Sequence, residues 1–196
     1  MKLFGDTYIG IYDNALTKKE CEILINQFEK LPHSEGGFSR NGVFTVDYNS
    51  KKSIDVDNLR LSDNSIVSNI ILCRIKECLK KYIREYPLVN RNLQKWGLEE
   101  QYNFQKYETE EDGYKNWHTE AGGYATSYRI LAWMFYLNNA KSGTEFMRYG
   151  KIPAKMGRGL IWPAAWTHVH RSAIPNKGLK YIVTGWGAFL PPEQAA

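Results

Sequence analysis

Three short segments in the second half of the chain decide the expected fold and site: Trp-His-Thr-Glu (117–120), Trp-Thr-His-Val-His (166–170) and Gly-Leu-Lys-Tyr (178–181). His118 and Glu120 are two residues apart, so on a strand both side chains would point to the same side and bind one metal ion together. A third ligand has to come from far along the chain, where His168 and His170 both qualify. Two histidines and one carboxylate bind one face of Fe(II) and leave the other positions open. The pattern indicates a catalytic rather than a structural metal site.

Short β-rich runs dominate the chain from Tyr102 onward. Aromatic and β-branched residues, interrupted by Gly-Gly, Asn-Asn and Pro turns, predict the strands Asn103–Tyr107, Arg129–Leu137, Gly159–Trp162 and Tyr181–Phe189. Many short strands at such spacing are typical of a double-sheet jelly roll, also called a cupin or double-stranded β-helix. We therefore expect a mainly β core.

The first hundred residues are expected to support that core. A short strand is predicted over Tyr8–Tyr12 and an extended segment over Val43–Tyr48. Thr17 and Glu20 form the pattern of a capping box, and the helix that follows them should end before Pro32.

A second, longer helix should begin at Ser62 or Asp63 and end before Pro87. Its expected apolar face consists of Ile66, Ile70, Ile75, Leu79 and Tyr82. Its charged face consists of Lys76, Lys80, Lys81 and Arg84. Such a face is most often simply solvated, and no nucleic-acid-binding signature accompanies it, so nucleic acid is not an expected partner. Both helices are expected to pack against one outer sheet.

Length and composition predict one ordinary globular domain. The chain has 196 residues and a formal net charge of +5 that is spread along it. No apolar run approaches the roughly 20 residues of a membrane-spanning helix, and the N-terminus lacks an apolar signal core. We therefore expect a cytoplasmic protein without a membrane partner. Cys21, Cys73 and Cys78 form no C-x-x-C pair and are expected to be buried, reduced thiols.

The ordered set of motifs between residues 102 and 189 resembles the Fe(II)- and 2-oxoglutarate-dependent dioxygenases, in particular their prolyl 4-hydroxylase-like branch. The motifs that match this branch are Tyr107, His118-Thr119-Glu120, Tyr136-Leu137-Asn138, Gly143-Thr144-Glu145-Phe146, Pro153-Ala154-Lys155-Met156-Gly157, Ile161-Trp162-Pro163, His170 and Lys180. A lone His-x-Glu would be weak support, whereas this order is specific. The resemblance independently implies the double-stranded β-helix.

The resemblance also implies a ligand set of His118, Glu120 and His170. The branch places a basic residue ten positions after its last histidine ligand, and counting back from Lys180 selects His170. His168 is then expected beside the ligands or on the substrate side, with ordinary packing as the alternative. Glu120 stands where typical prolyl hydroxylases carry aspartate, but glutamate occurs there in the wider family, so it is kept as a ligand.

For 2-oxoglutarate, the resemblance implies that Lys180 binds the distal carboxylate and that Tyr136 donates a hydrogen bond to it. Tyr107 has a weaker claim, as a hydroxyl that reaches the co-substrate. Arg129, Arg148 and Trp166 are candidates for substrate contacts. The glycine-containing loops at 36–37, 111–113 and 122–124 are candidates for lids over the site.

The expected function is that of a single dioxygenase domain over residues 1–196, with helical support over about 1–100 and the β-helix core over about 101–190. It would use Fe(II), 2-oxoglutarate and O2, supported by ascorbate, and hydroxylate prolyl residues of a peptide or protein. Two alternatives stay open. One is the same chemistry on a free amino acid, another small metabolite or a nucleic-acid base, and the other is a non-catalytic cupin-like binding module.

Overall fold

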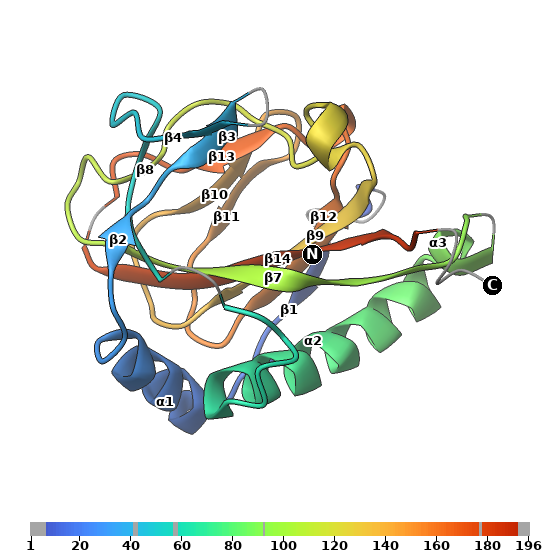
Figure 1. Cartoon of the computed structure of the whole chain (residues 1–196), viewed down its shortest axis with the longest axis horizontal. Helices are drawn as coiled ribbons and strands as arrows, with labels where there is room; N and C mark the ends of the chain where they lie inside the picture. Colours follow the sequence, from blue (N-terminus) through green and yellow to red (C-terminus); the bar gives the residue numbers. More distant parts are fainter. Residues whose placement is uncertain (1–6, 41–42, 57–58, 92, 177, 192–196) are drawn as a thin grey trace.

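The chain folds into two facing β-sheets, with two long helices packed beneath one of them (Figure 1). The computed structural model describes residues 7–40, 43–56, 59–91, 93–176 and 178–191. The strand pairs of both sheets are antiparallel. This arrangement is the double-stranded β-helix that the sequence predicts.

The major sheet has strand order β1-β12-β9-β14-β7-β6-β2. Its strands are β1 Gly10–Tyr12, β12 Gly159–Pro163, β9 Arg129–Tyr136, β14 Lys180–Phe189, β7 Trp96–Tyr107, β6 Ile54–Val56 and β2 Ser34–Glu35. The facing minor sheet has strand order β11-β10-β13, and two further two-stranded pairs join β5 to β8 and β3 to β4. These strands are β11 Gly150–Pro153, β10 Gly143–Phe146, β13 His170–Ser172, β5 Lys51–Lys52, β8 Gly113–Tyr114, β3 Phe38–Arg40 and β4 Val43–Thr45. The four strands predicted after residue 101 are confirmed as β7, β9, β12 and β14, and β7 begins seven residues earlier than predicted.

The major sheet separates two hydrophobic clusters, because successive residues of a strand point to opposite faces. On β9, one set packs toward the helices: Leu131, Trp133 and Phe135. The alternate set faces the space between the sheets: Ala132, Met134 and Tyr136. Ile182 and Trp186 of β14 belong to that inner cluster as well. The alternation thus decides which side chains can reach a site inside the barrel.

Helix α1, Lys18–Phe28, begins at the predicted capping box. The Thr17 backbone N–H donates to Glu20 Oε2 at 2.8 Å, and the Glu20 N–H donates to Thr17 Oγ1 at 3.2 Å. Cys21, Leu24 and Phe28 form its buried face. The helix ends at Phe28, before Pro32, as predicted.

Helix α2, Ile66–Glu85, is capped by Ser65, so the predicted caps Ser62 and Asp63 are wrong. Ser65 Oγ accepts a hydrogen bond from the Ser68 N–H at 3.0 Å. The predicted apolar face is wrong at its start, where Ile66 is 52% exposed. The face that packs against the sheet consists of Val67, Ser68, Ile71, Ile75, Cys78, Leu79 and Tyr82. Apolar residues at the start of the helix fit two overlapping faces, one through Ile66 and Ile70 and one through Val67 and Ile71. The second of these faces packs against the sheet.

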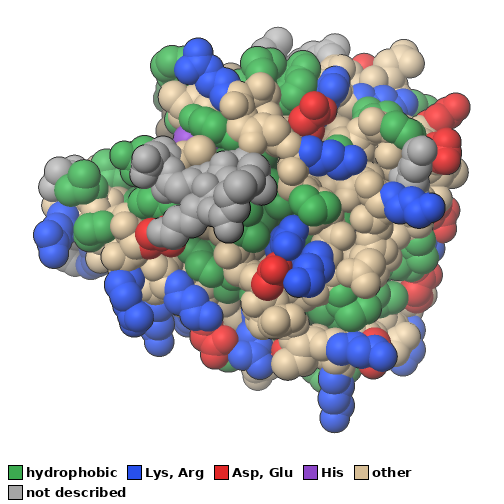
Figure 2. Space-filling model, turned by 180° about the vertical axis from the view of Figure 1, so that it is seen from behind, with side chains coloured by type: hydrophobic (Ala, Val, Ile, Leu, Met, Phe, Trp, Pro, Cys, Tyr) green, Lys and Arg blue, Asp and Glu red, His purple; other side chains and the backbone are tan. Residues whose placement is uncertain are grey.

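Both helices cover the outer face of the major sheet, as predicted (Figure 1). A short helix, α3 Leu88–Arg91, follows α2 and was not predicted. Cys21 and Cys78 are buried free thiols, but Cys73 is exposed, which corrects the expectation for that residue. None of the helices described in the structure is both long and apolar enough to cross a membrane. Figure 2 shows Lys and Arg side chains scattered over the back of the molecule.

Candidate metal site

His118 and His170 are joined by their backbones inside the barrel. The His118 N–H donates to the His170 carbonyl at 3.0 Å, and the His170 N–H donates to the His118 carbonyl at 2.9 Å. His118 makes only this isolated bridge and Glu120 lies in a turn, so the expectation that both stand on one strand is wrong. Thr119 still points away, because its hydroxyl donates to the Ala164 carbonyl.

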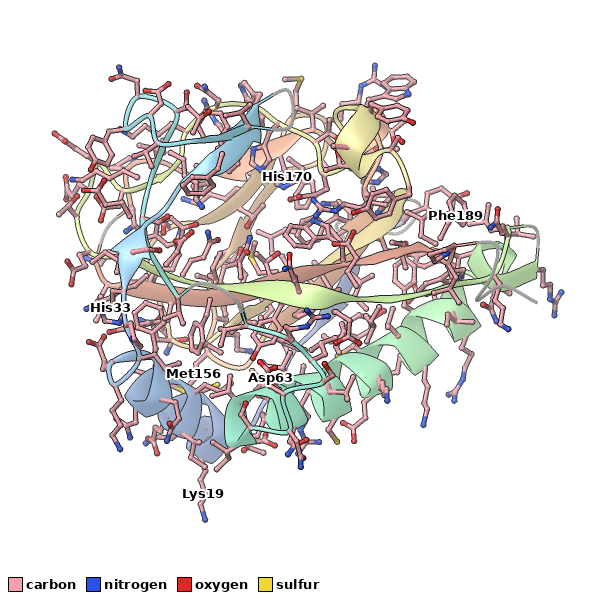
Figure 3. All side chains as sticks on the ribbon, viewed as in Figure 1. Lys19, His33, Asp63, Met156, His170 and Phe189 are labelled. Carbon is pink, nitrogen blue, oxygen red and sulfur yellow. The ribbon has the colours of Figure 1, made fainter. Side chains whose placement is uncertain are left out.

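One donor atom from each of three side chains lies within 4.8 Å of the other two: His118, Glu120 and His170. Glu120 Oε1 is 3.3 Å from His170 Nε2 and 3.9 Å from His118 Nε2. Adjacent donors at about 2.1 Å from one ion and at right angles lie about 3 Å apart. The Glu120–His170 distance is close to this value, and the other donors would have to move closer together around a first-row metal ion. In Figure 3, His170 lies on the side of the major sheet opposite to α1 and α2.

The second ring nitrogen of each histidine is held by a backbone carbonyl. His118 Nδ1 is 3.0 Å from the Asn116 carbonyl oxygen, and His170 Nδ1 is 3.0 Å from the His168 carbonyl oxygen. A carbonyl can only accept, so each Nδ1 carries the hydrogen and donates it. A neutral imidazole then presents its Nε2 lone pair, which is the atom that a metal takes. In that tautomer both Nε2 atoms and the Glu120 carboxylate face one another, so a cation could bind between them.

The charge states of Glu120 and His118 also favour binding of a cation. Burial opposes the charge on Glu120, but the His170 and His118 imidazoles and the hydrogen bond from Trp186 outweigh burial and lower the pKa of Glu120 to about 2. Burial and the neighbouring His170 lower the pKa of His118 to about 3. At neutral pH the site thus contains a carboxylate and an uncharged His118.

Aromatic rings enclose the two histidines. The Tyr114 ring stacks on His118 with centroids 3.6 Å apart. Trp162 and Phe146 lie beside His170, with ring centroids at 5.1 Å and 5.5 Å. This wall limits the freedom of the rings and the access of water.

His168 turns away from these donors. Its Nε2 is 2.6 Å from the Thr7 carbonyl oxygen and its Nδ1 is 2.9 Å from Thr167 Oγ1. It is not among the clustered donors of the described residues. The geometry thus favours His170 over His168 as the third donor, and His168 ties the η2 turn (Trp166–His168) to the segment before β1.

Lys180, Tyr107 and Tyr136 lie together between the sheets. Lys180 is only 2% exposed, and its Nζ is 4.5 Å from the centroid of the Tyr107 ring, which lies opposite it on β7. Burial, with a smaller effect from Lys151, lowers the pKa of Lys180 to about 8. Among the residues that the structure describes, no carboxylate forms an ion pair with Lys180. A buried cation in this position is available to an anionic ligand.

The two tyrosines are held by neighbours. The Tyr136 hydroxyl is 2.6 Å from Thr144 Oγ1, and the Tyr107 hydroxyl donates to Gln105 Oε1 at 3.2 Å. Burial raises the pKa of Tyr136 to about 12 and that of Tyr107 well above its usual range. Both phenols therefore keep their hydrogen at neutral pH, and Tyr107 donates its hydrogen to Gln105.

The other residues expected near the substrate take different places. Trp166 is 76% exposed and Arg148 is exposed, so both remain accessible at the surface. Arg129 stacks on the Trp186 ring and pairs with Glu99. Its guanidinium group is therefore already engaged by the protein, although it was a candidate for a substrate contact. Of the expected lids, the 111–113 loop has buried Asp112 and Gly113 at its end, and Asp112 pairs with Lys52 at 3.1 Å. That loop is anchored rather than free.

Sequence reasoning missed two sets of residues around the site. One is Trp186, whose indole N–H donates to Glu120 Oε2 at 2.7 Å. The other is a buried network of Lys51, Asp55 and Gln105, in which Asp55 Oδ2 accepts from both partners at 2.9 Å. The sequence could have predicted Trp186, because it lies an even number of residues after Lys180 and therefore on the same face of β14. Nothing in the local sequence predicts that Gln105 donates to Asp55, which lies 50 residues earlier in the chain.

An apolar groove of about 750 Å³ lies outside the barrel and contains none of the expected site residues. It is lined by Tyr8, Tyr82, Glu85, Tyr86, Pro87, Leu88, Val89, Leu93, Ile130, Leu131 and Pro163. The metal donors and Lys180 are separate from it.

No protein-family model and no curated protein matches this sequence. Solved structures match its fold. The chain superposes with a TM-score of 0.69 on a prolyl hydroxylase from Trichoplax adhaerens, in complex with a hypoxia-inducible factor peptide fragment, at 15% identity over 94% of this chain and 85% of that one. A viral collagen prolyl hydroxylase from Paramecium bursaria Chlorella virus-1, in complex with 2-oxoglutarate, gives 0.62 at 16% identity over 95% and 98%.

A third similar structure has a different printed activity. The non-heme α-ketoglutarate-dependent epimerase from nogalamycin biosynthesis gives a TM-score of 0.66 at 11% identity, over 95% of this chain and 79% of that one. The chain therefore has the fold of the Fe(II)- and 2-oxoglutarate-dependent oxygenases, a fold that includes the prolyl 4-hydroxylase-like branch.

Proposed function

We propose that this chain, which has the oxygenase fold, is an Fe(II)- and 2-oxoglutarate-dependent dioxygenase that hydroxylates prolyl residues of a peptide. One observation carries the proposal: two histidine nitrogens and a carboxylate oxygen converge inside the barrel, in the same chain that buries Lys180 without a carboxylate partner among the described residues. A non-catalytic binding module would have no use for both features.

In this proposal, His118, Glu120 and His170 hold Fe(II) through Nε2, Oε1 and Nε2. The ion, when bound, supplies the redox chemistry that splits O2, with one oxygen atom going to succinate and the other to the hydroxylated product, while 2-oxoglutarate loses CO2. The backbone carbonyls behind each Nδ1 keep the imidazoles in the tautomer that binds metal. The aromatic wall of Tyr114, Phe146 and Trp162 excludes water from the reacting atoms.

Lys180 would bind the distal carboxylate of 2-oxoglutarate, because a buried ammonium group gains a charge-assisted hydrogen bond there. Tyr136 would help to bind the same carboxylate; it pairs with Ile182 of β14, two residues from Lys180 on the same face of the strand. Tyr107 would position the ammonium group through its ring, at 4.5 Å, rather than through its hydroxyl, which is engaged by Gln105.

A peptide substrate is supported by the surface next to the site. The hairpin β3–β4 exposes Val43 and Phe44, each at 65%. The hairpin's Phe38 ring lies 5.8 Å from the Tyr114 ring, which stacks on His118. An extended Pro-rich chain suits an apolar rim of this kind, because the locked φ of proline lowers the entropy cost of binding. Two of the similar structures are also prolyl hydroxylases.

The competing candidate is the same chemistry on a free amino acid or another small metabolite. The similarity to an epimerase of nogalamycin biosynthesis favours it, because the same fold there has a different activity.

Product analysis separates the two substrates. The protein is incubated with Fe(II), ascorbate, 2-oxoglutarate and a panel of Pro-rich peptides, and the peptides are read by tandem mass spectrometry. We expect a gain of one oxygen on a proline ring, absent in Glu120→Ala. If the peptides stay unmodified while a free amino acid or other metabolite accelerates succinate formation, the peptide proposal is wrong and the small-substrate candidate replaces it.

A further inference from the structure

The two carboxylate oxygens of Glu120 face different partners. Oε2 accepts the hydrogen bond from Trp186 Nε1 at 2.7 Å. Oε1 faces His170 Nε2 at 3.3 Å and His118 Nε2 at 3.9 Å. One oxygen is thus taken by the protein, and the other points to the place between the histidines.

The Trp186 indole is itself fixed. Its side chain is buried in the inner cluster, on the same face of β14 as Lys180. The Arg129 guanidinium lies over its ring at 3.6 Å from the centroid, and Arg129 Nε donates to Glu99 Oε1 at 3.1 Å. Burial and the Arg129 stacking restrain the indole, and its N–H points to Glu120.

Not every buried indole in this protein finds a partner. Trp133 Nε1 and Trp162 Nε1 are buried without a hydrogen bond. Packing alone therefore does not bring an N–H to an acceptor here, and the Trp186 contact reflects the placement of both residues. Glutamate also has one more rotatable bond than aspartate, so its carboxylate needs an additional restraint to stay in one orientation.

From this geometry we propose that Trp186 is a positioning residue that makes Glu120 a ligand through Oε1 alone. The hydrogen bond engages Oε2 and keeps Oε1 toward the histidines, so Glu120 would hold a metal ion through one oxygen and would leave open the position that a second oxygen could take. This inference rests on the proposed metal site and adds to it the residue that orients the Glu120 carboxylate.

Metal binding tests the proposal without turnover. Mn(II) is titrated calorimetrically into the metal-free protein, into Trp186→Phe, which removes the N–H but keeps an aromatic ring, and into the matched control Trp133→Phe, which removes an unpartnered N–H. Loss of such a supporting hydrogen bond typically weakens metal binding about 10–100-fold. We expect a loss of about tenfold or more in Trp186→Phe and less than about threefold in Trp133→Phe.

Two further readouts separate positioning from packing. In the Glu120→Asp background the shortened carboxylate no longer reaches the indole, so Trp186→Phe should add no further loss of affinity. The Co(II) absorption spectrum should change in Trp186→Phe and stay unchanged in Trp133→Phe. The proposal would be overturned if Trp186→Phe lowered the metal affinity equally in the parent protein and in Glu120→Asp. An unchanged metal affinity in Trp186→Phe would also overturn it. Failure of the parent protein to bind Mn(II) or Co(II) would overturn the metal site itself.

Discussion

His118, Glu120 and His170 show what a sequence can and cannot reveal about a single residue. Their identity and spacing predicted a clustered donor set, and the structure places the three donor atoms together. The orientation of each donor depends on contacts that no motif contains: the Asn116 and His168 carbonyls behind the imidazoles and the Trp186 indole behind the carboxylate. Residue type follows from the pattern, whereas the restraint on each residue follows from packing.

The donor set predicts a clear difference among four alanine variants. His118→Ala, Glu120→Ala and His170→Ala each remove a proposed inner ligand, so each should lose most of its metal affinity. His168→Ala removes a contact with the Thr7 carbonyl and should keep appreciable metal binding. Calorimetric titration with Mn(II) checks this. Full binding by His170→Ala together with loss in His168→Ala would show that the third ligand is misassigned.

Lys180 should dominate the affinity for 2-oxoglutarate. Lys180→Met leaves the distal carboxylate without its cation, which should cost about 2–5 kcal/mol of binding free energy. Tyr136→Phe removes one hydrogen bond and should cost about 1 kcal/mol. Anaerobic titration of the Mn(II)-loaded protein with 2-oxoglutarate measures both. Parent-like affinity in Lys180→Met would place the co-substrate elsewhere.

Burial of Lys180 also predicts a pH dependence. Because its pKa is lowered to about 8, the ammonium group is present below that pH and is lost as the pH rises through it. The affinity for the 2-oxoglutarate dianion should therefore weaken above about pH 8. Lys180→Arg keeps its charge throughout this range and should flatten the profile. A profile with the same slope in both proteins would assign the dependence to another group.

At the scale of elements, α2 shows how the start of a helix can be misread. Four polar residues in succession, Ser62, Asp63, Asn64 and Ser65, all suit a cap. Asp63 instead accepts a hydrogen bond from the Arg60 N–H at 2.9 Å, which closes a turn before the helix. The strands inside the barrel were easier to predict where they are long, as in β9 and β14, than where they have two to four residues, as in β5 and β13.

The cap predicts a matched pair of stability effects. Ser65→Ala removes the acceptor for the Ser68 N–H and should lower the free energy of unfolding by about 1 kcal/mol. Ser62→Ala should change it by less than about 0.5 kcal/mol, because only the Ser62 backbone N–H is engaged, with Glu100. Urea unfolding followed by circular dichroism compares them. Equal effects of the two substitutions would contradict the assignment of the cap.

At the scale of the whole molecule, the sequence predicted a double-stranded β-helix with two buttressing helices, but not how the first third of the chain enters it. β1 pairs with β12, and β6 pairs with β7, so distant segments complete the major sheet. Local periodicity predicts a strand but not its partner. The same limit hid the link from Lys51 through Asp55 to Gln105, which ties the segment before β6 to the barrel.

Consumption of 2-oxoglutarate tests the central claim most directly. The purified protein is stripped of metal, reloaded with Fe(II), and supplied with O2, ascorbate and 2-oxoglutarate, and succinate is measured with and without Pro-rich peptides. The account predicts succinate formation that needs Fe(II), is stimulated by a substrate, and is lost in His118→Ala, Glu120→Ala and His170→Ala. Absence of Fe(II)-dependent succinate from folded protein that binds Fe(II), across peptides and small metabolites, would contradict it.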